Sequence, residues 1–338
     1  MKMGTLSVVM SSYNYGSYIG DALEAILSQS FRPMEVIVVD DASTDDSADV
    51  VNQFARRDPI IKLVRNERNM GVHYVAEKGI NLACGEYLYG AAADDRILPG
   101  FFEKSMRLLE QYPEAGLCST DIGYINAQGH IVGEYRAGVV DQTSFLSPSG
   151  ILKSLYKDPA YIVGGSTIFR RAALDEAGGF PPQLLSLCDW FTERAIALKH
   201  GACYIPEVLY LWRMTEGQYS ATCYKNPWEM LKVVDQAVEL MQSPRYSDTF
   251  PPDFVDYWVN RFGGEVIDEA LTGLHDYQYA FMEQFGKCVK PSGLVNRLLR
   301  RTLWSMTRYA LSFSKSSLTR GLSPIREKSR AGVNKQSN

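Results

Sequence analysis

The chain has 338 residues, of which 46% are hydrophobic and 22% are charged, and this is enough to bury a large core and an appendage. No apolar stretch reaches the roughly eighteen residues that cross a bilayer, and the N-terminus lacks the profile of a cleaved signal peptide. The six cysteines form no CxxC pair and have no histidine at ligand spacing, so free thiols are favoured over disulfides or zinc. With a net charge of −4, these features predict a soluble cytoplasmic enzyme.

The first elements form one predicted βαβ unit. A β-branched strand over residues 6–10 runs into the polar turn 11–16, and apolar residues at helical spacing follow from Ile19 to Leu27. A second strand covers residues 35–39. Because the first turn contains neither GxGxxG nor GxxxxGK[ST], the dinucleotide-binding and P-loop hypotheses lose most of their support.

Two pairs of acids follow strand-like runs that lie about fifty residues apart. Asp40-Asp41 comes after the second strand, and Asp94-Asp95 comes after the run 86–93. Carboxylates at the ends of parallel strands gather on the ligand-binding edge of an open α/β sheet. Paired acids at that edge favour a divalent metal and a phosphorylated ligand. A single Asp could instead cap the next helix, but this alternative explains two adjacent pairs less well.

Strands and helices alternate to about Thr120, and the Gly- and Tyr-rich segment 121–149 then predicts antiparallel strands or a loop. The later predicted elements are helices over 151–156, 171–176 and 187–200, a strand over 162–169, and helices over 228–242 and 254–285. Gly178-Gly179 and Gly201 are expected to end two of these helices.

Five segments, in their order and spacing, resemble glycosyltransferase family 2 with its GT-A fold. They are Val8–Asn14, Glu35–Asp45, Asn69–Gly71, Ala83–Tyr87 and Ala93–Asp95. The resemblance covers roughly residues 5–215 and implies an α/β, Rossmann-like mixed sheet, mostly parallel, flanked by helices. It also implies an inverting transferase that uses a nucleotide-activated sugar and a Mn²⁺ or Mg²⁺ ion.

The predicted domains follow from this coverage. Residues 1–215 form the catalytic domain, with nucleotide-sugar binding in 1–120 and an acceptor half in 121–215. Residues 216–290 form a C-terminal helical appendage, and residues 291–338 form a basic amphipathic, partly disordered tail.

The resemblance places the donor nucleotide at the first-strand turn, Ser12-Tyr13, and at Asp40-Asp41. Tyr13 offers a ring to stack on uracil, and Asp41 offers an acceptor for its imide N–H. Asp40 could equally be the partner that reads the base, and Tyr13 could instead be a packing residue. Asn14 fits a turn former better. The preferred donor is therefore a UDP-sugar.

Asp94 and Asp95 match the end of the family's DxD element. Asp95 is the predicted metal ligand, and Asp94 is assigned to the ribose or to a metal-bound water. Ala92 replaces the first acid of a fuller motif, but two acids suffice for an ion that takes its other ligands from water and the diphosphate. A second departure from the family is Ala76-Glu77, which replaces the usual Arg-Asn.

Inversion needs a carboxylate beside the acceptor hydroxyl, and Asp189 is the predicted catalytic base by resemblance. Cys188 replaces the Glu that usually precedes this Asp. Asp189 could instead be a helix N-terminal acid favoured by the dipole, and Glu193, one turn later, is the reserve candidate. Trp190 is expected to shape the acceptor pocket.

Three further residues are assigned to the diphosphate or the acceptor. Arg213 could offset the charge of the leaving diphosphate, while Thr215 stands where relatives carry a histidine. The segment Gly164-Gly165-Ser166 could bring backbone N–H groups and the Ser166 hydroxyl near the ligands, with a tight turn as the equal alternative.

The C-terminal tail is strongly basic. From residue 286 onward it carries twelve Lys or Arg against the single acid Glu327, a balance of +11. Residues 294–313 read as a basic amphipathic helix that lies on an anionic membrane surface, at the inner face of the cell membrane. The alternative is a helix docked on the catalytic domain. No nucleic-acid motif accompanies the tail, and nucleic acid is not an expected partner.

The predicted function is therefore transfer of a sugar to a glycan or lipid-linked acceptor, with surface polysaccharide synthesis suggested by family analogy. A retaining or nucleotidyl transferase is a weaker alternative, because the chain lacks an Arg- and Gly-rich loop near its N-terminus. A catalytically idle sugar-nucleotide binding or scaffold module is the other alternative, because it would tolerate Ala92, Cys188 and Thr215.

Overall fold

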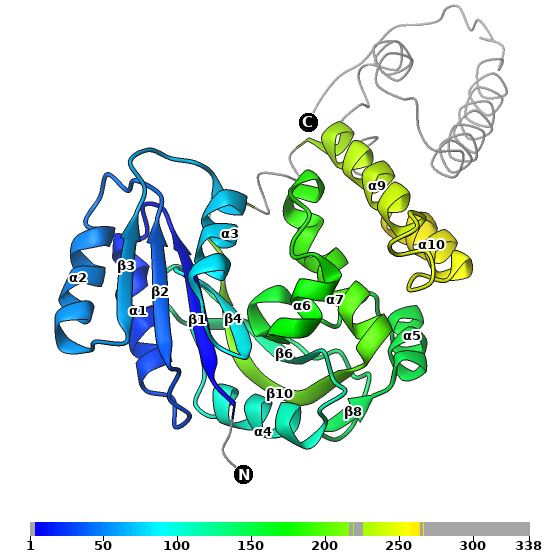
Figure 1. Ribbon diagram of the computed structural model, residues 1–338, viewed down its shortest axis with the longest axis horizontal. Coiled ribbons are helices and arrows are strands. Elements are labelled where there is room, and N and C mark those ends of the chain that lie inside the picture. The colour runs from blue at the N-terminus through cyan, green and yellow to red at the C-terminus, as the bar shows by residue number, and fades with distance from the viewer. Residues whose placement is uncertain (1–3, 216–218, 220–225, 264–265, 267–338) are drawn as a thin grey trace, which may run out of the picture.

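The computed structural model describes residues 4–215, 219, 226–263 and 266, which build one mixed sheet flanked by helices (Figure 1). The sheet order is β3-β2-β1-β4-β9-β6-β10-β5, with β7 paired to β6 and β8 paired to β10. The strands are β1 (Leu6–Ser12), β2 (Glu35–Asp40), β3 (Ile61–Arg65), β4 (Tyr87–Ala92), β5 (Arg96–Ile97), β6 (Leu117–Ile125), β7 (Ile131–Tyr135), β8 (Ser144–Leu146), β9 (Ile168–Arg170) and β10 (Ala202–Arg213). The predicted fold class, a mixed sheet with helices on its faces, is confirmed.

Helices cover both faces of this sheet. They are α1 (Gly16–Leu27), α2 (Ser47–Arg57), α3 (Val72–Leu82), α4 (Phe101–Gln111), α5 (Pro148–Lys157), α6 (Arg171–Ala177), α7 (Cys188–His200), α9 (Pro227–Met241) and α10 (Pro252–Trp258), with short turns η1 (Gly164–Ser166) and η2 (Pro182–Leu187) and the π-helix η3 (Val259–Gly263). One hydrophobic cluster joins α1, α2 and α4 to one face, and a second joins α3, α5, α6, α7, α9 and α10 to the other.

The first βαβ unit forms as its sequence predicts. β1 and β2 pair in parallel with Val8 opposite Val36, and β2 is buried along its whole length. Such strands read as continuous apolar runs because both faces are covered. In α1 the buried residues include Ile19 and Leu23, and each fully buried aliphatic side chain contributes roughly 1.5–3 kcal/mol.

The parallel pairing brings three strand ends to the same edge of the sheet. Ser12 at the end of β1 lies opposite Asp40 at the end of β2, and Ser11 lies opposite Ala92 at the end of β4. The first-strand turn and the two acidic pairs therefore meet at the carboxyl edge.

The second half of the sheet is more irregular. β6 and β10 are parallel, β9 runs antiparallel between β4 and β6, and β7 adds an antiparallel edge strand. The segment 121–149 thus follows the antiparallel alternative. The predicted strand over 162–169 is wrong for most of its length, because residues 164–166 form a 3₁₀ turn and β9 begins only at Ile168.

The predicted appendage shares its core with the acceptor half. Trp258 of α10 stacks on Trp190 of α7 with ring centroids 4.8 Å apart, and Phe250 stacks on Phe191 at 5.3 Å. Of the predicted helix 254–285, the structure describes α10 and η3. Residues 264–265 and 267–285, and the whole predicted tail 291–338, lie outside the described residues.

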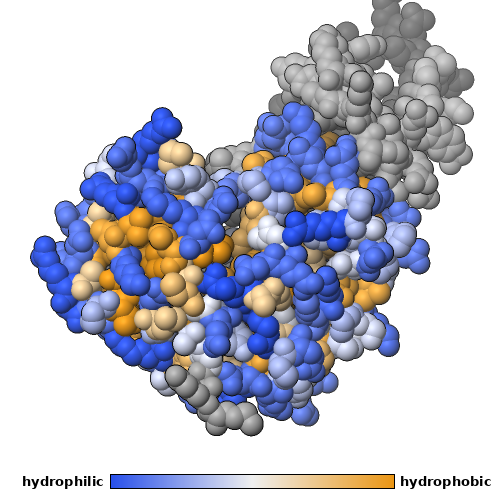
Figure 2. All heavy atoms as spheres, in the orientation of Figure 1, coloured by the Kyte–Doolittle hydropathy of each residue, from blue (hydrophilic) through white to orange (hydrophobic). Residues whose placement is uncertain are grey.

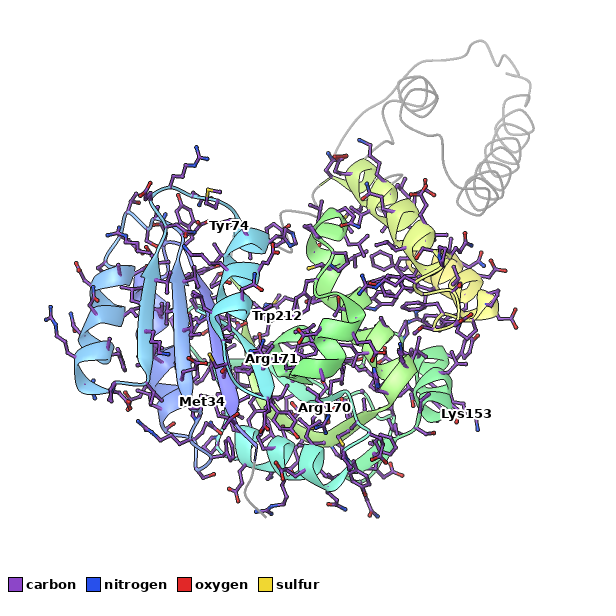
Figure 3. All side chains as sticks on the ribbon, in the orientation of Figure 1. Met34, Tyr74, Lys153, Arg170, Arg171 and Trp212 are labelled. Carbon is purple, nitrogen blue, oxygen red and sulfur yellow. The ribbon has the colours of Figure 1, made fainter. Side chains whose placement is uncertain are left out.

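Two adjacent arginines join the halves of the sheet (Figure 3). Arg171 donates from Nε to the Gly85 carbonyl at 2.7 Å and from Nη2 to the Ala83 carbonyl at 2.7 Å, which ties α6 to the loop before β4. Arg170 donates from Nη1 to the Tyr87 hydroxyl at 2.9 Å.

In the part of the chain that the structure describes, no helix is both long and apolar enough to cross a membrane.

Candidate active site

The turn after β1 leaves one aromatic ring in solvent at the carboxyl edge. Tyr13 is 44% exposed, while its neighbour Asn14 is held in the left-handed region at φ 59°. The Asn14 N–H donates to Ser43 Oγ at 2.9 Å, and its Oδ1 accepts from the Thr44 N–H at 2.8 Å. Asn14 is therefore a turn former, and the ring of Tyr13 remains available for stacking.

Asp40 and Ser12 lie buried beneath this turn. Asp40 Oδ2 accepts from the Ser43 N–H at 3.1 Å and pairs with Arg65 Nε at 3.2 Å. Asp40 Oδ1 and Ser12 Oγ are buried without a hydrogen-bond partner among the described residues. Buried polar atoms are normally satisfied, so two such orphans at adjacent strand ends indicate a place where a ligand or water completes the hydrogen bonding.

Asp41 instead fastens a neighbouring loop. Its Oδ1 accepts from Asn66 Nδ2 at 2.7 Å and from the Met70 N–H at 2.9 Å, and its Oδ2 accepts from the Gly71 N–H at 2.8 Å. Gly71, at φ 87°, is the N-cap residue directly before α3. Asp41 thus sets where α3 starts, and a base-reading role requires it to share this carboxylate with the ligand.

Asp94 and Asp95 lie side by side and are 6% and 7% exposed. Asp95 accepts hydrogen bonds from the Tyr210 hydroxyl and, at 2.7 Å, from the Arg213 N–H. Burial, and then the negative charge of Asp94, raise the pKa of Asp95 to about 7. Burial, with a contribution from the same two acids, raises the pKa of Tyr15 to about 12, so the Tyr15 hydroxyl also borders the pair.

Arg213 is buried, and its side chain supports the backbone of the turn that carries Asp94 and Asp95. Its Nε donates to the Asp94 carbonyl at 2.6 Å, and its Nη1 donates to the carbonyls of Asn126 and Ala127 at 3.1 Å each. The guanidinium lies 4.6 Å from the centre of the Tyr18 ring. This geometry makes Arg213 a support for Asp94 and Asp95, and its contact with a diphosphate stays a prediction.

Asp189 lies in the first turn of α7, half-buried against a glycine. Its Oδ1 accepts from the Trp190 N–H at 2.7 Å, and a Cβ placed on Gly164 would come within 2.7 Å of its Oδ2. Burial raises the pKa of Asp189, although the Trp190 N–H and the charges of Arg194 and His73 oppose the rise. A carboxylate made more basic in this way suits proton abstraction near neutral pH.

The 3₁₀ turn η1 connects Asp189 to the acidic pair. Gly164 packs on Asp189, and a Cβ on the next residue, Gly165, would overlap the Tyr210 hydroxyl. Tyr210 in turn donates to Asp95. The predicted base and the predicted metal-binding acids therefore lie on the two sides of one glycine turn.

Ser166, the third residue of this turn, is fully buried. Its hydroxyl lies 2.9 Å from Ser119 Oγ and donates to the Thr120 and Val163 carbonyls at 3.1 and 3.0 Å. These contacts give Ser166 a structural role. Residues 164–166 form a tight turn, which was the alternative that the sequence left equally open.

The reserve base and the predicted acceptor residue are both engaged in packing. Glu193 is buried in an ion pair with Arg194 at 2.7 Å, and burial raises the pKa of Glu193 to about 8. Arg194 donates to the Pro159 and Ile162 carbonyls. Trp190 donates from Nε1 to the Pro159 carbonyl at 3.1 Å and stacks on Trp258. Contact of Trp190 with an acceptor stays a prediction.

Sequence reasoning missed Tyr15, Tyr210 and His73. Tyr15 lies in the predicted polar turn 11–16, so its position at this edge of the sheet could have been predicted. Tyr210 reaches Asp95 only because β10 lies beside β5, and His73 reaches α7 only through the tertiary fold. No local pattern in the sequence indicates either contact.

A metal site can be tested against the donors that are present. Among the described residues, no group of three or more His, Cys, Asp or Glu side chains is arranged to hold a metal ion. The Asp94-Asp95 pair nonetheless fits an ion with few protein ligands, because two adjacent carboxylates are buried there and a cation would offset their charge.

Two cavities elsewhere are distinct from this site. Arg170 lines both of them. The cavity of about 490 Å³ lies beside the start of β6, and the cavity of about 570 Å³ lies beside the residues before β1. They therefore lie at the amino ends of the parallel strands, opposite the acidic edge. In Figure 2 the surface is recessed between the part built on β1–β3 and the part built on α6 and α7.

Comparison with known sequences places this constellation in a family. The profile described as Glycosyl transferase family 2 matches residues 7–178. The chain belongs to glycosyltransferase family 2. The match spans β1 to α6, so the acidic pairs and the glycine turn lie inside it, whereas Asp189 and Arg213 lie beyond it. This family 2 chain is accordingly a glycosyltransferase.

Relatives and solved structures agree with this assignment. The chain is 30% identical over 278 residues to the uncharacterized protein MT1568 of Mycobacterium tuberculosis, which covers 79% of this chain and 85% of that protein. S. aureus TarS 1–349 shares the fold with a TM-score of 0.64 at 18% identity, covering 83% of this chain and 77% of that one. The mannosyltransferase PcManGT from Pyrobaculum calidifontis, solved with GDP-Man and Mn²⁺, gives 0.58 at 20% identity over 94% and 83%. Both neighbours support the GT-A-like fold.

Proposed function

We propose that this family 2 enzyme transfers a sugar, with inversion, from a UDP-sugar to a hydroxyl of a glycan or lipid-linked acceptor. The observation that carries the proposal is the glycine turn η1, which sets Asp189 on one side and the Tyr210–Asp95 contact on the other. A base and a diphosphate-binding edge separated by one turn is the arrangement that in-line attack requires.

The donor nucleotide would bind across the ends of β1 and β2. The exposed ring of Tyr13 can stack on uracil, and the orphan atoms Asp40 Oδ1 and Ser12 Oγ offer an acceptor and a hydroxyl beneath it. Asp41, already bonded to the loop that begins α3, would share its carboxylate with the base. TarS has been solved with UDP-GlcNAc, which supports a uridine donor for a chain of the same fold.

Asp95, with Asp94 beside it, would hold a Mn²⁺ or Mg²⁺ ion. When bound, such an ion offsets the charge of the diphosphate and so aids its departure. Tyr210 and the Arg213 N–H orient the Asp95 carboxylate, and the Arg213 side chain fixes the backbone of Asp94. Because Asp94 and Asp95 are the two carboxylates of this site, water and phosphate oxygens would fill the remaining ligand positions of the ion.

Asp189 would act as the general base. Its carboxylate takes the proton of the acceptor hydroxyl while that oxygen attacks the sugar carbon from the side opposite the diphosphate, which inverts the configuration. Burial against Gly164 raises the pKa of Asp189, so the carboxylate accepts this proton more readily than an exposed Asp would.

A thermal-shift panel tests the donor assignment. The protein is heated with UDP or GDP, each with Mn²⁺ or with a chelator. A ligand that binds only the native state raises the melting temperature by mass action. We expect UDP with Mn²⁺ to give the largest rise. Equal stabilisation by GDP would contradict the uridine preference, and an unchanged rise in chelator would contradict the metal.

The charge of the C-terminal sequence supports an acceptor held at a membrane. The +11 balance from residue 286 onward favours an anionic surface at about 1 kcal/mol per basic residue. We expect the full chain to pellet with anionic vesicles in low salt and a form truncated at Ser292 to stay in solution. Equal pelleting of the two forms, or equal binding to neutral vesicles, would contradict this part of the proposal.

A further inference from the structure

His73 connects the nucleotide half of the enzyme to the helix that carries Asp189. It lies in the first turn of α3, two residues after Gly71, whose N–H is bonded to Asp41. Its Nε2 lies 3.0 Å from the Tyr219 hydroxyl, and its Nδ1 lies 3.9 Å from Cys188 Sγ at the start of α7. The Tyr219 ring also packs edge-on against the imidazole, at 5.9 Å.

The chemistry of Cys188 decides how this contact works. Burial and the negative charge of Asp189 raise the pKa of the Cys188 thiol far above its usual range, so the thiol stays protonated. A protonated thiol can donate to Nδ1, which leaves Nε2 to carry the proton and donate to Tyr219. The pair is therefore a structural contact, and the raised pKa of the thiol disfavours an activated Cys–His nucleophile.

The charges around Asp189 come from a small set of groups. Within α7 these groups are Arg194 and Glu193. The charge of Arg194 lowers the pKa of Asp189, and Glu193 is paired to Arg194. Across from α7, His73 of α3 also lowers the pKa of Asp189, while burial lowers the pKa of His73 itself. His73 is thus neutral near neutral pH and becomes charged only as the solution turns acidic.

We propose that His73 is a positioning residue for the catalytic base: through Cys188 it holds the first turn of α7, so that the Asp189 carboxylate stays against Gly164 and faces the acceptor. This inference rests on the proposed function of Asp189. The contact from His73 fixes this turn from the nucleotide side. Because Asp41 fixes the start of α3, the donor site and the base then share one continuous support.

The test is steady-state kinetics of the full chain bearing His73→Ala, with His73→Gln as the conservative variant and His130→Gln as the control. His130 is an exposed histidine on the turn between β6 and β7, and its hydrogen bonds among the described residues use its backbone N–H and carbonyl. Transfer is followed as UDP release from a UDP-sugar with Mn²⁺, and UDP affinity is measured separately.

We expect His73→Ala to lower kcat about ten-fold, since misplacing a catalytic group by about 1 Å can cost up to 10²-fold, with the KM for the donor nearly unchanged. The acid limb of its kcat profile should move to higher pH, because the positive charge that His73 gains in acid, which lowers the pKa of Asp189, is lost. His73→Gln should recover part of kcat, and His130→Gln should match the wild type.

An unchanged kcat and pH profile in His73→Ala would overturn the inference. A loss of kcat matched by an equal loss of UDP affinity and of melting temperature would do the same, because it would indicate a general structural role. Asp189→Asn is measured alongside. If that variant still transfers sugar, the proposed base and this inference both fail. If it is inactive while His73→Ala is normal, the proposed function stands and only the inference fails.

Discussion

The acids of the nucleotide half and the acid of the acceptor half are held in different ways. Asp41 accepts three hydrogen bonds from its own protein, and Asp95 accepts two. The Asp189 side chain accepts one, from the N–H of the next residue. Protein donors fix the direction of the Asp41 and Asp95 carboxylates, which suits ligand or metal binding, whereas Asp189 has one such donor and a raised pKa, which suits proton transfer.

The glycine turn between these acids should be the most sensitive point of the comparison. Gly165→Ala places a methyl group onto the Tyr210 hydroxyl, so Tyr210 must move away from Asp95. We expect a loss of about 1–3 kcal/mol in the free energy of unfolding from overpacking, together with weaker Mn²⁺-dependent UDP binding. Urea unfolding and calorimetric titration measure the two effects.

Gly90→Ala is the matched control, because a Cβ at this position in β4 meets no atom within 4 Å. If Gly90→Ala weakens Mn²⁺-dependent UDP binding as much as Gly165→Ala, the turn has no special place between the two acids.

The raised pKa of Asp95 predicts that the free energy of unfolding depends on pH. The folded state binds the Asp95 proton up to about pH 7, whereas an unfolded Asp releases it near 3.9. Its contribution to stability is therefore complete below the unfolded pKa and is lost as pH rises through about 7. We expect the wild-type free energy of unfolding to fall over this window more steeply than that of Asp95→Asn.

Urea titrations at a series of pH values between about 4 and 8, the range set by the two pKa values, measure this difference. Parallel curves for the two proteins would show that Asp95 titrates like an exposed acid. In that case the contrast between a crowded acidic pair and a single base would disappear.

A further prediction concerns the exposed ring of Tyr13, where the change touches ligand binding and leaves the fold intact. Tyr13→Ala should weaken UDP binding by about 1–3 kcal/mol, the usual contribution of one base–aromatic stack, and Tyr13→Phe should bind almost normally. Tyr74 on α3 is equally exposed, at 45% against 44%, so Tyr74→Ala is the control (Figure 3). Equal losses in both alanine variants would remove the special role of Tyr13.

The sequence was informative where structure is local. The run from β1 to β2 could be predicted because its apolar spacing and polar turn depend on neighbours within one unit. The same holds for α6, which ends at Gly178 in the left-handed region, as a helix-ending glycine should. The acids that gather at the carboxyl edge could also be predicted, because parallel strands fix where their ends meet.

The sequence did not predict the features that depend on contacts between residues far apart in the chain. Residues 164–166 have the apolar flanks of a strand, but the chain turns there because Asp189 and Tyr210 occupy the space beside two glycines. Arg213 is buried with its donors on the Asp94 carbonyl and the carbonyls of residues 126–127, and the sequence predicted none of these contacts. Neither set of partners is near in sequence.

The central claim is that Asp189 and the acidic pair serve one transfer reaction, and Asp189→Asn tests it most directly. UDP release from UDP-sugars with Mn²⁺ is measured for this variant and the wild type, and UDP affinity is measured for both. We expect the wild type to release UDP and the variant to lose about 10²–10⁴-fold in rate, the usual contribution of a general base, with UDP affinity nearly unchanged. Equal release by the two proteins, or none from the wild type with any UDP-sugar, would contradict the account.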